Sequence, residues 1–545
     1  MGYFVTAPKV VASCEILWRA FLCSKKERDV ATTSVHSPPP DQAGGGASVQ
    51  GFGRTVVKGA IWMVLARVTD RTLGMISTLV LARLLVPADY GIVAMATAVI
   101  ALLDLFRAFN FDVVLIQNRQ AQRRHYDTAW TFNVLLSAGV AAGLVILAFP
   151  AAHYYGEHRI VAPMYVLAIA TFVGGFQNIG VVDFRKDLQF HREFLLLFLR
   201  KLVAFAVTIP LAFALRSYWA LVLGILTSQA ADVALGYMLH PFRPRFTFAA
   251  CRELFDFSKW LALNNFIYFF VQRSPDFIVG KLGGARALGL FNMANEIAMM
   301  SVSELSAPIN RATFPAYAQK AADISDLRRS YLDVLSVSTL LVLPVAGGLA
   351  SLAGRLVPLL LGPNWVDAAP LVALFAIYGA LHAIDTNSAY VFLALGKPRL
   401  ITIVGSVRAG MLAVLLLIGM LFNGVEGAAQ GCFVSIALTL PVSFFLLVRN
   451  IDLGLADLLG RLWRPAAATA AMAVAVFVLA QAMPFGDTSL EALVRLLLVA
   501  ALGALAYVAG LLALWYVSGL PTGAEHYIVQ AIRSRLVRRC DAEDS

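Results

Sequence analysis

A succession of apolar stretches, each long enough to cross a lipid bilayer, restricts this chain to very few kinds of fold. A membrane-spanning helix requires about 20 mainly apolar residues, and we count about fourteen such stretches between residues 59 and 517. Hydrophobic residues make up 59% of the sequence and charged residues only 14%, and the mean hydropathy is +0.74. A water-soluble protein would have to bury all of these stretches at once. The sequence therefore predicts an all-α polytopic membrane protein.

The net charge of +11 is distributed in a pattern that indicates membrane topology. Every second loop is basic, and the loops between are short and contain little lysine or arginine. Examples of the basic loops are those with Arg119, Arg123 and Arg124, with Arg185, Lys186 and Arg192, and with Arg449, Arg461 and Arg464. This alternation follows the positive-inside rule and predicts that both chain termini are cytoplasmic. We therefore expect a lipid bilayer, and no nucleic acid, as the partner of this charge.

Two segments of the chain share one pattern of apolar spans and breaks. The segment from Trp62 aligns without a gap with the segment from Trp260, so that Gly91 meets Gly289 and Met95 meets Met293. Each copy has an apolar span, a basic residue at its end, a short break and a second span that opens near a glycine. A duplicated block in a membrane protein is typical of transporters with two lobes. We predict about 14 transmembrane helices, in two six-helix lobes related by a parallel repeat plus two C-terminal helices.

Changes in composition place the domain boundaries. We expect a disordered cytoplasmic N-terminal tail, an N-lobe of spans one to six, a cytoplasmic inter-lobe linker, a C-lobe of spans seven to twelve, the last two spans and a basic cytoplasmic tail. These are residues 1–54, 55–239, 240–257, 258–450, 451–520 and 521–545. The tail is predicted from its polar, proline- and glycine-rich composition. The mixture of apolar and basic residues in the linker favours a helix at the cytoplasmic interface.

Charged residues inside the predicted spans are the candidate site residues, because charges in hydrocarbon usually face a protein interior or a wet cavity. The substrate-binding candidates are Arg67, Asp70, Arg71, Arg107, Arg273 and Arg408. The arginines outnumber the acids close to them, which indicates a cationic cavity suited to a pyrophosphate or an acidic sugar. The alternative is that each acid–base pair joins neighbouring helices and contacts no ligand.

Acidic residues in the spans are candidates for ion coupling, namely Asp276, Glu296, Glu304 and Asp385. Asp104 and Asp276 also lie three residues from Arg107 and Arg273 and are expected to pair with them.

No enzymatic machinery is encoded in the motifs. The sequence has no G-x-x-x-x-G-K-[ST] motif for nucleotide phosphates. Its five cysteines are dispersed, with no metal-ligand spacing. We expect no catalytic residues, no metal and no cofactor, and transport that is passive or driven by an ion gradient.

One stretch places the chain by resemblance. Residues 80–133 contain Ala82 to Leu85, Pro87, Asp89 to Gly91, Asp104 and Leu115 to Gln117 in the order typical of one family of exporters. This pattern resembles the polysaccharide-transport branch, the oligosaccharide flippases, of the multidrug/oligosaccharidyl-lipid/polysaccharide exporter superfamily. Asn110 departs from it where a glycine is usual. The resemblance extends over about residues 55–450, including 184–190 and 287–298.

The resemblance implies a function and a location. It implies a flippase of the bacterial inner membrane that moves an undecaprenyl-pyrophosphate-linked repeat unit to the periplasmic leaflet by alternating access, for exopolysaccharide, O-antigen or capsule synthesis. A polysaccharide polymerase and co-polymerase are the expected protein partners. The alternatives are a peptidoglycan-precursor flippase, a drug/cation antiporter of the same superfamily and a non-transporting scaffold for polysaccharide synthesis.

Overall fold

The computed structural model describes residues 45–107, 111–117, 121–482 and 489–519, and these residues form helices joined by short connections, with no strand among them. Ten of the helices in these ranges are long and apolar enough to cross a membrane. The described part is thus an all-α polytopic membrane fold. Residues 1–44 of the predicted tail and the predicted basic tail at 521–545 lie outside the described residues.

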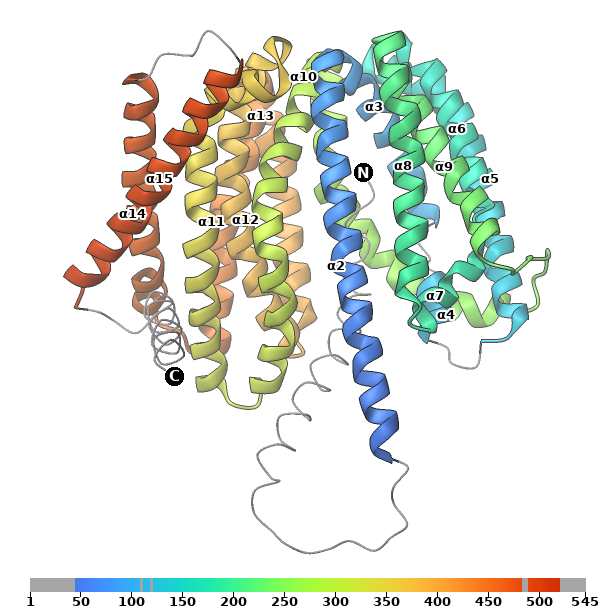
Figure 1. Ribbon diagram of the computed structural model, residues 1–545, viewed down its shortest axis with the longest axis horizontal. Helices are drawn as coiled ribbons and strands as arrows, with labels where there is room; N and C mark the ends of the chain where they lie inside the picture. Colours follow the sequence, from blue (N-terminus) through green and yellow to red (C-terminus); the bar gives the residue numbers. More distant parts are fainter. Residues whose placement is uncertain (1–44, 108–110, 118–120, 483–488, 520–545) are drawn as a thin grey trace, which may run out of the picture. The chain divides into compact units, whose positions relative to one another are not determined.

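The chain divides into two compact units. Unit 1 contains residues 1–85 and 96–269. Its helices are α2 (Gly45–Leu84), most of α3 (Pro87–Leu103), η1 (Asp104–Arg107), α4 (Phe111–Gln117), α5 (Arg123–Tyr155), η2 (His158–Ile160), α6 (Val161–Gly175), η3 (Ile179–Val182), α7 (Asp183–Lys186), α8 (Phe190–Leu215) and α9 (Trp219–Leu239). Helix α8 packs between α2 and α9, and α6 packs between α5 and α9 (Figure 1).

Unit 2 contains residues 86–95 and 270–545. Its helices are α10 (Cys251–Lys320), which starts in unit 1, α11 (Ile324–Leu361), η4 (Pro363–Ala368), α12 (Ala369–Ala394), α13 (Pro398–Ile451), α14 (Leu455–Ala482) and α15 (Ser489–Val517). Helices α11, α12 and α13 enclose a core that includes Tyr331, Phe392 and Leu447, each at most 1% exposed. Helices α14 and α15 pack on each other and on α11 (Figure 1).

The two longest helices each contain a break in the helical backbone. In α10 the break is at Gly284, which has φ +72°, and in α13 it is at Asn423 and Gly424, where Gly424 has φ +56°. Glycine adopts these positive φ values without the strain that a side chain would introduce. Both breaks fall in the short connections that the apolar pattern predicts near residues 283–285 and 423–424.

The start of α3 and the second half of α10 cross at backbone contact, inside unit 2. A Cβ atom added at Gly91 would overlap the carbonyl oxygen of Ala285, and one added at Gly289 would overlap the carbonyl oxygen of Pro87. The two contacts are reciprocal in the repeat alignment, which equates Gly91 with Gly289 and Pro87 with Ala285. Only glycine allows two helix backbones to approach this closely.

Two expected boundaries differ from the observed ones. Helix α2 begins at Gly45, ahead of residue 55, where the N-lobe was predicted to start. The prediction of an interfacial helix in the inter-lobe linker is wrong for residues 240–248, which are not helical, and α10 begins at Cys251. The reason is the pair Pro241 and Pro244, because each proline lacks a backbone N–H and drives the preceding residue out of the helical region.

Candidate anion-binding site

The interface between α2 and α8 carries the candidate site of unit 1. One glycine and three aromatic residues bring the two helices together near the start of α8. A Cβ atom at Gly59 would overlap the ring of Phe190, and the rings of Trp62 and Phe194 lie 5.1 Å apart. The residues of α2 that face α8 are three or four apart, at positions 59, 62, 66, 70 and 73, and therefore lie on one face of the helix. This face includes Asp70, in the middle part of α2.

Asp70 and Lys201 form an ion pair across this interface. The Lys201 Nζ lies 3.5 Å from the Asp70 Oδ1, and the two side chains are 29% and 19% exposed. Gly74, one turn after Asp70, leaves space for the lysine, whose Nζ would be in ordinary contact with a Cβ at that position. A small cleft beside the pair, lined also by Thr69 and Phe198, has room for about one water molecule.

Arg67 and Arg71 flank Asp70 on α2, at one helical turn before it and one residue after it. Both are partly buried, and both take part in interactions. Together with Lys201 they place more positive than negative charge on this part of unit 1. A partly buried group of this kind can bind phosphate or carboxylate, because arginine stays charged and donates two parallel hydrogen bonds.

A second acid–base group lies next to it, between α8 and α9. Arg200 precedes Lys201 on α8, and its Nη1 lies 3.5 Å from the Asp232 Oδ2. Gln177, which follows α6, donates from Nε2 to the same oxygen at 2.7 Å. Two consecutive residues of α8 thus pair with acids on two different helices. Lys201 pairs with Asp70 of α2, and Arg200 pairs with Asp232 of α9.

The remaining unit 1 candidate is Arg107, in the 3-10 turn η1. Its Nη1 donates to the Asp104 Oδ1 at 3.2 Å, which confirms the predicted local pair. The side chains are 30% and 44% exposed, so the pair is open to its surroundings.

In unit 2, Arg273 and Asp276 of α10 also form the predicted pair, with 3.0 Å between Nη1 and Oδ2. Asn292, in the second half of the same helix, donates to the other carboxylate oxygen, Oδ1, at 3.0 Å. Asp276 is only 4% exposed. Both oxygens of this ion-coupling candidate therefore have a donor.

Arg408 and Asp385 belong to a buried polar group between α12 and α13 of unit 2. The Arg408 Nη1 lies 3.9 Å from the Asp385 Oδ2 and 3.1 Å from the His382 Nδ1. The Nη2 of Arg408 donates to the Tyr378 hydroxyl at 2.6 Å. Arg408 and Asp385 are each 8% exposed. This arrangement binds two helices together and leaves the arginine little access to a ligand.

The last two candidates are acids with exposed side chains. Glu296 and Glu304, on the second half of α10, are both exposed, and Glu304 takes part in an interaction. Within the described ranges, no group of three His, Cys, Asp or Glu side chains could hold a metal ion.

Four polar residues of unit 1 were missed at the sequence level. They are Gln177, Arg200, Lys201 and Asp232. Arg200 and Lys201 lie inside the predicted span 194–215 and on α8, and two basic residues within an apolar stretch are themselves a signal of a polar contact. Asp232 in the predicted span 217–239 carried the signal that could have revealed it, since an acid in an apolar helix needs a partner.

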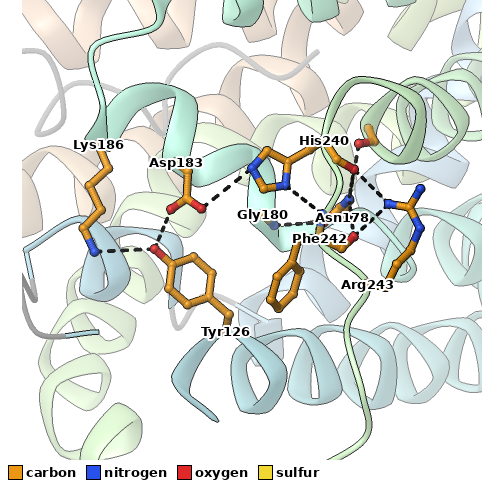
Figure 2. Close-up of polar contacts among 9 residues, drawn as sticks. Tyr126, Asn178, Gly180, Asp183, Lys186, His240, Phe242 and Arg243 are labelled. Atoms are coloured by element: carbon orange, nitrogen blue, oxygen red, sulfur yellow. Dashed lines mark hydrogen bonds and ion pairs between the residues drawn. The ribbon is translucent and has the colours of Figure 1, made fainter. Parts of the chain in front are cut away.

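A separate polar network fixes the linker to the ends of unit 1 helices (Figure 2). The buried Asn178 side chain donates to the carbonyl oxygens of Gly236, His240 and Phe242, at 3.3, 3.4 and 3.0 Å. The Tyr126 hydroxyl donates to the Asp183 Oδ1 at 2.5 Å.

Further along, backbone amides of the linker donate to side chains in the first turns of α5. The acceptors are Asp127, for Arg245 at 2.9 Å, and Thr131, for Thr247 at 3.0 Å. Because these bonds replace the helical hydrogen bonds that the prolines prevent, the linker is ordered without being helical.

The linker is expected to loosen on acidification. Burial lowers the pKa of His240 below 6.5, and Arg192 and Arg243 add to the lowering while Asp183 opposes it. The folded protein thus binds fewer protons here than the unfolded chain, so stability falls as the pH drops below about 6.5. Hydrogen exchange of the linker amides, corrected for the intrinsic pH effect, should rise between pH 7.5 and 5.5.

The variant His240→Asn is the control for this prediction. It retains an acceptor for the Phe242 amide, which donates to the His240 Nδ1 at 3.2 Å, but it does not titrate. An acid response as large as that of the wild type would contradict the assignment to His240.

The fold and the buried charges define an all-helical, multi-pass membrane protein. Its structure is similar to that of the lipid II flippase MurJ in an inward closed conformation, with a TM-score of 0.66, 11% sequence identity and coverage of 84% of this chain and 99% of that one. At this identity the likeness shows the fold alone. It agrees with an all-helical membrane protein.

The sequence matches the polysaccharide biosynthesis protein family over residues 80–370. The chain therefore belongs to this family. Curated relatives include the lipopolysaccharide biosynthesis protein WzxC of Escherichia coli K12, 23% identical over 72% of this chain and 81% of its own length. The teichuronic acid biosynthesis protein TuaB of Bacillus subtilis 168 is 23% identical over 72% of this chain and 82% of its own length. The resemblance identified from residues 80–133 is confirmed.

Proposed function

We propose that this protein is a lipid-linked oligosaccharide flippase, which moves an undecaprenyl-pyrophosphate-linked repeat unit from the cytoplasmic to the periplasmic leaflet by alternating access. The observation that carries the proposal is the excess of cations on α2 and α8 of unit 1. Lys201 pairs with Asp70, and Arg67 and Arg71 lie within one turn of that acid on α2, inside helices of membrane-spanning length. Family membership adds the polysaccharide pathway.

The chemistry of the substrate fits this group. A pyrophosphate is a dense anion that loses its hydration on entering a membrane, and guanidinium groups supply replacement hydrogen bonds in bidentate geometry. Lys201 carries a point charge on a flexible side chain. It pairs with Asp70 in the structure, and a bound pyrophosphate would compete with Asp70 for this charge. Arg107, Arg273 and Arg408 are the further candidates from the sequence. Of these, Arg107 has the more exposed pair, and Arg408 is the most enclosed.

The proposal includes a topology. We place about 14 transmembrane helices in the chain, because α10 and α13 each break into two segments of spanning length and α2 adds a further span. In this topology the N-lobe is 55–239, the C-lobe 258–450 and the last two spans lie in 451–520. Residues 1–54, 240–257 and 521–545 are cytoplasmic, and the membrane is the bacterial inner membrane.

Protein partners and coupling are part of the same proposal. A polysaccharide polymerase and co-polymerase would consume the flipped unit, and no covalent chemistry is assigned to this chain. Asp276, Glu296, Glu304 and Asp385 are retained as candidates for ion coupling. Asp276 is the weakest of them, since Arg273 and Asn292 already occupy its two oxygens.

Two related functions differ in the charge that they require. A drug/cation antiporter needs acids to bind its cationic substrate, whereas cations predominate on α2 and α8. A peptidoglycan-precursor flippase would share the anionic head group, but the curated relatives named above belong to polysaccharide pathways by their names. A scaffold without transport activity would not require paired charges in the middle of so many spans.

Removing two positive charges tests the proposal. The double substitution Arg67→Gln and Arg71→Gln is expected to lower polymer export at least about tenfold, because a hydrogen bond to a charged group contributes about 1.5–3 kcal/mol. The measurements are cell-surface polysaccharide and the accumulated lipid-linked repeat unit in a deletion strain that carries the variant.

The matched control is Arg159→Gln with Arg286→Gln. Both arginines are more than half exposed, in pairs with Glu157 and Asp367, so export should be normal. Normal export by the Arg67/Arg71 variant would overturn the binding assignment. A deletion strain with normal surface polysaccharide and no accumulated intermediate would overturn the flippase.

A further inference from the structure

Asp232 is a buried acid in a membrane-length helix with one carboxylate oxygen unused. It lies on α9 and is 6% exposed. Its Oδ2 accepts from Gln177 and lies near Arg200, as described above. Its Oδ1 is equally buried and accepts no hydrogen bond from any residue that the structure describes. A buried carboxylate oxygen without a donor is costly, and the cost falls on the charged form.

Among the residues that the structure describes, α6 and α8 supply one charge to this acid. Arg200 is the charged residue of α8 that reaches it, and the sequence of α6 contains no charged residue. Asp276 of unit 2 is different, because donors reach both of its oxygens. The ionised form of Asp232 thus depends on Arg200 for its charge compensation and on Gln177 for its one hydrogen bond.

Arg200 is the member of this pair that a ligand can reach. Its side chain is 28% exposed, against 9% for that of Asp232. An anion that bound to Arg200 would take the guanidinium away from Asp232 and leave a buried carboxylate without a counter-ion. Such a group ends up neutral by binding a proton.

We infer that Asp232 is a proton-binding site linked to anion binding at Arg200, so that the head group and one proton bind unit 1 together. The inference rests on the proposed function for the identity of the anion. In the step itself, the acid form of the buffer gives up a proton, which adds to the Oδ1 of Asp232, and Arg200 exchanges the carboxylate for the phosphate oxygens of the ligand. No bond of the substrate changes. The linkage is reciprocal, so protonation also strengthens anion binding.

A proton fits this site better than a metal cation. A bound Na⁺ would place a second positive charge beside the guanidinium, which repels it, whereas a proton cancels the carboxylate charge and provides a donor. Asp232 is also far too enclosed to offer the several oxygen ligands that a hard cation requires.

Calorimetry on the purified full-length protein tests the linkage. Binding of a short-chain polyprenyl pyrophosphate is measured in two buffers with different ionisation enthalpies, for the wild type and for Asp232→Asn. The difference between the two proteins cancels the proton exchange of the ligand itself. We expect the wild type to take up about one more proton and to gain up to about tenfold more affinity per unit of pH decrease. Equal uptake by both proteins would overturn the inference.

Further variants separate the possible outcomes. Arg200→Gln should lose the proton uptake as well, and it provides the test if Asp232→Asn does not fold. Glu157→Gln, which removes a surface acid paired with Arg159, should keep the uptake. Loss of uptake in Asp385→Asn instead, or replacement of the pH effect by a Na⁺ effect, would overturn the assignment to Asp232. Absence of binding at every pH would overturn the proposed function together with the inference.

Discussion

Gly91→Ala is expected to destabilise the protein by about 3–5 kcal/mol, the largest effect of any single methyl group that we can assign. The added Cβ would overlap the carbonyl oxygen of Ala285. Neither partner can move away by a change of rotamer, because the clash is with a backbone, so the two helices must separate. Contacts of the buried Met95 and Met293, which are at most 1% exposed, would be lost with it.

Yield and thermal unfolding of the detergent-purified protein measure this effect. Gly289→Ala should cause a loss of similar size, since its Cβ would overlap the carbonyl oxygen of Pro87. Gly410→Ala is the control in the same unit, because nothing lies within 4 Å of a Cβ there, and alanine favours helix by about 1 kcal/mol. A Gly91→Ala protein as stable as Gly410→Ala would show that α3 and α10 do not cross at backbone contact.

Arg408→Met is expected to cost about 3–5 kcal/mol, because it leaves the buried Asp385 without a counter-ion. Methionine has a similar length and keeps the packing between α12 and α13, so the loss reports the charge. Adding Asp385→Asn to this variant should recover a large part of the stability, since the unpaired charge is then absent. Thermal unfolding of the two single variants and the double variant gives the coupling energy.

An exposed pair is the control for this cycle. Arg286 and Asp367 are 66% and 60% exposed, so Arg286→Met should change stability by less than about 1 kcal/mol. If Arg408→Met with Asp385→Asn is no more stable than Arg408→Met alone, the role of Arg408 is its bonds to Tyr378 and His382 and not the charge of Asp385.

Features that depend on residues close together in the sequence were predictable. The apolar runs predicted an all-helical membrane fold, and the gaps between them coincide with the breaks at Gly284 and Gly424, because hydropathy and glycine act on their own segment. The pairs Asp104–Arg107 and Asp276–Arg273 were predictable for the same reason, since residues three apart face one another on a helix.

Contacts between residues of different helices could not be predicted from these local patterns. The partner of Asp70 is Lys201 on α8, whereas the sequence offered only the adjacent Arg67 and Arg71. Asp232 was not singled out, because its donors come from α8 and from the segment after α6. Which helix faces which is set by packing, and one sequence contains no direct record of it.

The linker was misassigned for a different reason. Its alternation of apolar and basic residues, Phe242 to Phe248, fits an interfacial helix by composition. The prolines prevent that helix. The backbone amides of the segment donate hydrogen bonds instead to the side chains of Asp127, Thr128 and Thr131. Turn-forming residues outweigh composition where they fall inside a short segment.

The reciprocal crossing of Gly91 and Gly289 has the symmetry of a two-fold contact. In a symmetric homodimer, residue i of one subunit touches residue j of its partner, and j touches i in return. Gly91 with Ala285 and Gly289 with Pro87 obey this rule under the repeat alignment. The crossing therefore has the exchange relation of an isologous interface, with both halves carried by one polypeptide. The charged residues do not keep this relation, because Arg67 and Arg71 align with Asn265 and Phe269.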